Sequence, residues 1–275
     1  MSKILLIVEG AVSEPKYLKQ FIKYHDEQMI KNGNKVSPIV VQSYGTLIYD
    51  LYKKISSQLT EDEFETIPVL IEILKEKKIK YDEQLDDYEQ FSDIFLFFDL
   101  DAHYYCKCEN RNENIYSSMN ELIPFFSEST EKGKLLISYP MFEALKCFKD
   151  EFMAENEVLL HLFNIYEVGK NGSSTTFKKK SIELTSNGYN DPTFSVEKIE
   201  KLVQYFIHCS FYLVCDQTNI SNSQAIFENQ YKKFIEPSNQ VVILSAFPHF
   251  IIDVFGIQPY YDKKVRTINC RNISE

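Results

Sequence analysis

The sequence contains little glycine and proline and has no long apolar run. Its 275 residues include 8 Gly and 9 Pro, too few for a glycine-rich fibre or a proline-rich linker protein. No stretch approaches the roughly 20 apolar residues of a membrane-spanning helix. The apolar run from Ile4 to Val8 is also shorter than the core of a signal peptide, about 7–15 residues. We therefore expect a cytoplasmic protein with no membrane partner.

Positive charge is scarce as well. The chain has 30 Lys and Arg against 40 Asp and Glu, a net charge of −10. This balance argues against a nonspecific coat on nucleic acid, because such binding needs many cations to neutralise phosphates. It does not exclude an enzyme that reaches phosphates through bound metal, since a divalent cation can reverse the local sign of an acidic site. Hydrophobic residues at 44% and charged residues at 25% are typical of a packed globule.

The cysteines show no pattern of metal binding. No CxxC pair occurs, and no histidine stands at the spacing of a zinc ligand. We expect reduced thiols, most of them buried, at Cys106, Cys108, Cys147, Cys209, Cys215 and Cys270.

Apolar runs and helical periodicity alternate over the first 150 residues. The run KILLIV stops at Glu9-Gly10, as a buried strand ending in a tight turn would, and a helix follows from Ser13 or Glu14. A charged stretch with one apolar helical stripe predicts a helical insertion at about residues 58–91. Further strands are expected at residues 38–41, 92–100 and 134–139, and another helix starts at residues 140–148. This alternation predicts an α/β fold with a mostly parallel sheet flanked by helices.

The second part of the chain has a different pattern. Residues 151–275 are expected to form a mainly helical region, with its longest helix at residues 196–214 and one strand at residues 240–245. Residues 169–191 are rich in Ser, Asn, Gly and Lys, which is typical of an exposed loop. We assign this region to substrate or partner binding.

Carboxylates follow the ends of two predicted strands. Glu9 ends the first strand, and Asp99 and Asp101 end the most apolar one, SDIFLFFDL. Ligands bind at the carboxyl ends of strands in open α/β sheets. In an extended chain, residues two apart point to one face, so Asp99 and Asp101 could bind one cation. Glu14 is near enough to join them, and such like charges would repel without Mg²⁺ or Mn²⁺.

A structural interpretation competes with this one. A single acidic residue after a strand is most often a turn former or a helix cap, and for Glu14 alone we favour that role. For Asp99 and Asp101 we favour function, because they follow a fully apolar strand at the edge where ligands bind.

The arrangement resembles a known family. IVEG at Ile7–Gly10, SEPKYL at Ser13–Leu18 and a later strand ending in DLD look like the Toprim domain of bacterial and phage-defence nucleases. Within that family it is similar to the RloB-like and OLD-type (overcoming lysogenization defect) groups. SYPMFEAL at residues 138–145 is similar to an RloB-like segment. The resemblance covers roughly residues 3–148 and implies a Toprim-like catalytic domain at residues 1–150.

The resemblance implies metal-dependent cleavage of phosphodiester bonds in DNA or RNA, including tRNA. Glu9 matches the Toprim glutamate, Asp99 and Asp101 match its metal-binding DxD, and Glu14 matches a second acidic residue of the OLD-type version. Glu143 is a further candidate ligand. Lys146 could stabilise negative charge on a transferring phosphoryl group. An ion pair on one helix face explains Glu143 and Lys146 equally well.

The sequence also departs from the family. Tyr139-Pro140 stands where the RloB-like group has Asn-Pro. The chain has no GxxxxGK[ST] phosphate loop, so an ABC-type or OLD-type ATPase of such a system would be a separate subunit. The resemblance thus implies an effector of antiviral defence by abortive infection, with an ATPase partner. A homo-oligomer is one open option for its assembly.

Two basic clusters stand out on this acidic chain. They are Lys178-Lys179-Lys180 and the segment at residues 262–266, DKKVR. Solvated surface is the default for each, yet they are the best candidates for holding a nucleic-acid backbone.

Two other functions remain open. FFDLD also resembles the first motif of haloacid-dehalogenase-like phosphatases, in which the first Asp is the nucleophile. That motif normally lies near the start of its fold, whereas Asp99 lies far along this chain. The second alternative is a noncatalytic Toprim-derived subunit of an ATPase complex.

Overall fold

The computed structural model describes residues 2–59, 63–154, 157–167, 175–186, 194–215, 220–260 and 267–272. The chain divides into two compact units. Unit 1 comprises Met1–Phe98 and Ser118–Leu136, and unit 2 comprises Asp99–Ser117 and Ile137–Glu275. The chain passes from one unit to the other near residues 98, 117 and 136.

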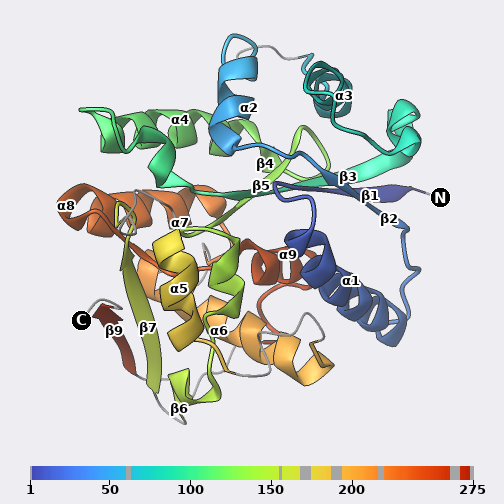
Figure 1. The fold of residues 1–275 in the computed structure, drawn as a ribbon. Helices are drawn as coiled ribbons and strands as arrows, with labels where there is room; N and C mark the ends of the chain where they lie inside the picture. Colours follow the sequence, from blue (N-terminus) through green and yellow to red (C-terminus); the bar gives the residue numbers. More distant parts are fainter. Residues whose placement is uncertain are drawn as a thin grey trace. The chain divides into compact units, whose positions relative to one another are not determined.

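A five-stranded sheet forms the framework of unit 1 (Figure 1). Its strand order is β2-β1-β3-β5-β4. β1 is parallel to both β2 and β3, and β4 is antiparallel to β5. The strands are β1 (Lys3–Val8), β2 (Ile39–Ser43), β3 (Phe91–Asp99), β4 (Ser127–Glu128) and β5 (Gly133–Ser138). The predicted α/β class, with a mostly parallel sheet flanked by helices, is confirmed.

Helices cover both faces of this sheet. α1 (Ser13–Lys31) lies on one face, and α2 (Ile48–Ile55) and α3 (Thr66–Glu76) lie on the other (Figure 1). The apolar stripe predicted for the insertion is α3, and its Leu70 lines a small apolar cavity together with Ile7 of β1. α3 is therefore part of the core of unit 1. α4 (Arg111–Phe125) runs from unit 2 into unit 1.

Unit 2 combines helices with a second sheet. Its helices are α5 (Thr175–Glu183), α6 (Val196–Val214), α7 (Ser223–Gln230), α8 (Glu236–Ser238) and α9 (Ala246–Phe255), with a π-helical turn, Tyr231–Ile235, between α7 and α8. Its strands are β6 (Met153–Ala154), β7 (Glu157–Asn164), β8 (Gln240–Val242) and β9 (Thr267–Asn272). β7 pairs antiparallel with β6 and β8 and parallel with β9. The prediction of a mainly helical region missed this sheet.

The helix expected at residues 140–148 is shorter than predicted. Only Phe142–Lys146 is helical, as a 3-10 turn. The backbone before this turn is anchored by Tyr139, which exchanges two hydrogen bonds with Leu244 at 2.7 and 2.9 Å. The Ser138 hydroxyl accepts a bond from the Ala246 N–H at 3.2 Å. The segment that carries Glu143 is therefore fixed to the start of α9.

Candidate functional site

Glu9 lies directly after β1 in unit 1. Its backbone N–H donates to the Phe97 carbonyl of β3 at 3.2 Å, and its carbonyl accepts from the Gly45 N–H at 2.9 Å. Two neighbouring strands thus fix the Glu9 backbone at the carboxyl end of the sheet, the edge that binds ligands in open α/β folds.

Glu14 closes the turn between β1 and α1. Its carboxylate is buried, with 7% of the residue exposed, and Oε1 accepts a hydrogen bond from the Gly10 N–H at 2.8 Å. A Cβ on Gly10 would stand only 2.7 Å from that oxygen, so a side chain at this position would displace the Glu14 carboxylate. This contact supports the structural role of Glu14, and its role as a metal ligand stays a prediction.

The loop after β3 belongs to unit 2 and bends where an extended chain was expected. Leu100 donates its N–H to the Ser138 carbonyl at 3.0 Å, and Asp101 donates its own to the Pro140 carbonyl at 3.2 Å. Asp101 has φ +42° and ψ +46°, in the left-handed region. The expectation that Asp99 and Asp101 share one face of a continuous strand is therefore wrong, because the strand ends at Asp99.

Asp101 lies in a small cluster of ionisable side chains in unit 2. Burial raises the pKa of its carboxyl above the ordinary value. The nearby charges of His103 and Lys178 lower this pKa, and the charge of Glu143 raises it. We refer to Asp101, His103, Glu143 and Lys178 as the Asp101 cluster. Burial and the charge of Glu143 both disfavour the charged form of Asp101, and the positive charge of Lys178 favours it.

Glu143 is paired with Lys178, a member of the basic cluster that we expected to be solvated surface or to hold a nucleic-acid backbone. Lys178 Nζ of α5 lies 3.4 Å from Glu143 Oε1, and the two side chains are 56% and 15% exposed. Lys146, the predicted catalytic lysine, has its Nζ 5.7 Å from the centre of the Phe142 ring. No motif or helical spacing links Lys178 to Glu143 in the sequence, since α5 follows only after β7.

The predicted metal ligands are not arranged as a complete coordination site in the described residues. Within the described ranges, no three His, Cys, Asp or Glu side chains lie close enough to hold an ion. Mg²⁺ usually keeps several waters and binds through only one or two carboxylates together with substrate phosphates. Asp101 and Glu143 are oxygen donors of the type that Mg²⁺ binds, and their role as ligands stays a prediction. Glu9, Glu14 and Asp99 as further ligands stay predictions.

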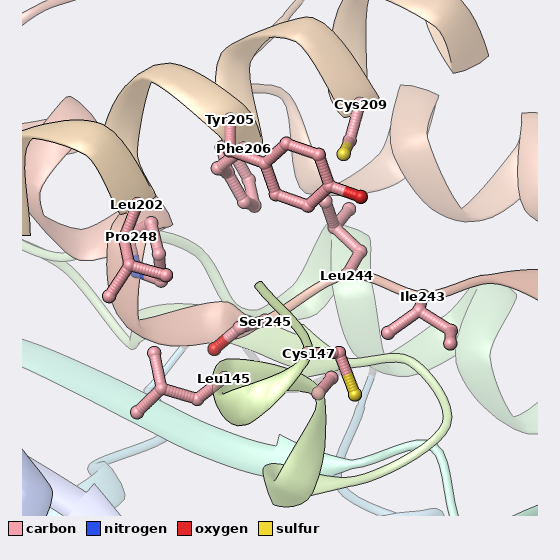
Figure 2. A pocket seen from close by; sticks show the side chains of 11 residues that line it. Leu145, Cys147, Leu202, Tyr205, Phe206, Cys209, Ile243, Leu244, Ser245 and Pro248 are labelled. Atoms are coloured by element: carbon pink, nitrogen blue, oxygen red, sulfur yellow. The ribbon is translucent and has the colours of Figure 1, made fainter. Parts of the chain in front are cut away.

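The cavity behind the Phe142–Lys146 turn has no chemistry of its own. It has a volume of about 20 Å³ and lies between this turn, α6 and the start of α9 (Figure 2). Its polar groups are already engaged or inert: the Tyr205 hydroxyl donates to the Leu159 carbonyl at 2.9 Å, and burial raises the pKa of the Cys147 thiol. We interpret this space as part of the core of unit 2.

The cysteine prediction needs correction. Among the described cysteines, Cys147 and Cys209 are buried, but Cys106, Cys108 and Cys215 are exposed. The exposed ones lie in a turn after β3 and at the end of α6, where no core covers them. The basic segment at residues 262–266 lies outside the described residues.

Comparisons with protein-family models, with curated proteins and with solved structures found no match. In the part of the chain that the structure describes, no helix has both the length and the apolar character needed to cross a bilayer.

Proposed function

We propose that this protein is a Toprim-like, metal-dependent nuclease. The observation that carries the proposal is the Asp101 carboxylate, held in a left-handed turn directly after β3 and desolvated beside Glu143. A strained, poorly solvated acidic residue at the carboxyl end of a parallel strand is characteristic of a working site, because neither property stabilises the fold.

The candidate residues would have separate roles in metal binding and positioning. Asp99, Asp101 and Glu143 of unit 2 would supply oxygen ligands for Mg²⁺ or Mn²⁺, and Glu9 is added as a ligand through the family resemblance alone. When bound, such a cation polarises a phosphate and lowers the pKa of attacking water. Within unit 1, the Glu9 N–H donates to the carbonyl of Phe97 in β3. Glu14 would position Glu9 by closing the turn behind it.

An assay of cleavage tests this assignment. Wild type and the double variant Asp99→Ala, Asp101→Ala are incubated with Mn²⁺ and with plasmid, single-stranded DNA or tRNA. We expect the double variant to lose more than about 100-fold in rate, since even the outer partners of metal ligands are worth about 10–100-fold. Asp150→Asn is the control, because the Asp150 side chain is 72% exposed and pairs across the surface with Lys201 at 3.3 Å. Cleavage equal to wild type in the double variant would refute the site.

The same purified protein distinguishes the nuclease from the two alternative functions, a phosphatase and a noncatalytic subunit. Release of inorganic phosphate from a generic monoester, without cleavage of nucleic acid, would identify a phosphatase. Absence of Mn²⁺ binding together with tight association with an ATPase would identify a noncatalytic subunit. A separate ATPase partner and a role in antiviral defence by abortive infection are part of the proposal through the family resemblance alone.

A further inference from the structure

One of three consecutive lysines on α5 contacts the Asp101 cluster. Lys178 Nζ lies 3.4 Å from Glu143, whereas Lys180 Nζ pairs with Glu167 at 2.6 Å. Lys179 is exposed and forms no ion pair with any residue in the described ranges. The three lysines lie on the same helix and each carries a positive charge, but they differ in what they contact.

The pair between Lys178 and Glu143 differs from an ordinary ion pair on the surface. Pairs between two exposed side chains contribute little, because water already solvates both charges. Here the glutamate is 15% exposed, and Asp101 beside it is desolvated too. Two neighbouring carboxylates that are poorly solvated repel each other. The ammonium group of Lys178 therefore stabilises negative charge that water solvates only weakly.

We propose that Lys178 is the counter-ion that a divalent cation displaces from Asp101 and Glu143, and that the displaced ammonium group then binds a phosphate of the nucleic-acid backbone. This inference rests on the proposed function, because it requires a cation at these two carboxylates. A lysine suits both states, since its ammonium is a compact charge on a flexible stem. Its phosphate contact would be independent of base sequence.

The proposal predicts two effects of opposite sign for a single substitution. Removing the charge of Lys178 removes a repulsion against the incoming cation, so metal should bind more tightly. It also removes a phosphate contact, so nucleic acid should bind more weakly. A lysine that only stabilised the fold would change neither affinity in this way.

The experiment compares wild type, Lys178→Gln and Lys179→Gln. Mn²⁺ binding is measured by electron paramagnetic resonance of the free ion. We expect Lys178→Gln to bind Mn²⁺ about tenfold more tightly, as a unit charge close to a divalent ion predicts at a partly exposed site. Binding of a labelled single-stranded oligonucleotide, measured by fluorescence anisotropy in Ca²⁺, should weaken about threefold to tenfold. Lys179→Gln should change the Mn²⁺ affinity by less than about twofold.

Each outcome decides a different point. If wild type binds Mn²⁺ and Lys178→Gln binds it equally well, this inference is overturned and the proposed function stands. If wild type binds no Mn²⁺, both are overturned. Tighter Mn²⁺ binding with unchanged oligonucleotide affinity overturns the phosphate contact. If Lys178→Gln fails to fold, Lys178→Met, which keeps the apolar stem, gives the same test. Lys178→Arg should have the Mn²⁺ and oligonucleotide affinities of wild type.

Discussion

The role of Glu14 can be decided by two substitutions that separate its hydrogen bond from its charge. Glu14→Ala removes both, whereas Glu14→Gln keeps an oxygen that can accept the Gly10 N–H at the 2.8 Å contact. We expect Glu14→Gln to bind Mn²⁺ and cleave nucleic acid within about twofold of wild type, because the structure supports a turn-closing role for this residue.

The expected loss of stability in Glu14→Ala follows from the burial of the hydrogen bond between Glu14 and Gly10. Glu14 is 7% exposed, so the Ala variant loses a charge-assisted hydrogen bond and leaves the Gly10 N–H without its acceptor. Such a loss costs about 1.5–3 kcal/mol. At about 2–4 °C per kcal/mol for a protein of this size, the melting temperature should fall by about 3–12 °C. Glu14→Gln should lose about half of that free energy, since a neutral acceptor is about half as strong.

Thermal unfolding followed by circular dichroism, together with Mn²⁺ titration, provides the measurement. Glu27→Gln is the matched control on α1, since its side chain is 43% exposed and lies 3.8 Å from Lys23. The reasoning is refuted if Glu14→Gln melts like wild type but loses Mn²⁺ binding by tenfold or more. That result would make Glu14 a metal ligand, as the family resemblance implies.

Two further predictions concern Asp101 and the glycine of β5. Because burial raises the pKa of Asp101 above its ordinary 3.8, the folded chain binds this proton more tightly than the unfolded chain, and stability falls as pH rises from 3.8 through the folded pKa. Asp101→Asn should therefore be more stable than wild type at neutral pH in EDTA, with the difference vanishing below pH 3.8; a difference independent of pH in denaturant titrations would contradict this. Gly133→Ala should cost about 2–5 kcal/mol, because φ is +110° and the new Cβ would stand 2.7 Å from Leu96 Cδ1. Gly33→Ala, with φ +74° and nothing within 4 Å, should cost only about 1 kcal/mol, and equal losses in the two variants would contradict the packing argument.

Local patterns located the main strands and the acidic residues that follow them. The runs that became β1, β3 and β5 are apolar enough to be recognised alone, because strands buried on both faces have near-continuous apolar sequences. β7 was missed although Val158 and Leu160 in it are fully buried. Its partners β8 and β9 lie more than 70 residues further along the chain, and periodicity within one short run does not separate a strand from a buried helix.

The same limit applies to the candidate site. The prediction that Asp99 and Asp101 share a face assumed an extended chain, and the hydrogen bonds from Leu100 and Asp101 to Ser138 and Pro140 bend it instead. Those bonds come from a segment nearly 40 residues away. The sequence pattern indicates Glu143 as a candidate ligand, but no motif or spacing in it indicates Lys178 as the partner of Glu143.

The sequence by itself determined the α/β alternation and the acidic residues at the ends of its apolar strands, because buried strands and the turns that end them are encoded in neighbouring residues. Only the tertiary structure decided which charges meet. The approach of Lys178 to Glu143 and the desolvation of Asp101 depend on how α5 and the Phe142–Lys146 turn pack in unit 2. Electrostatic interactions depend on distance and on exclusion of water, and packing between residues far apart in the chain sets both.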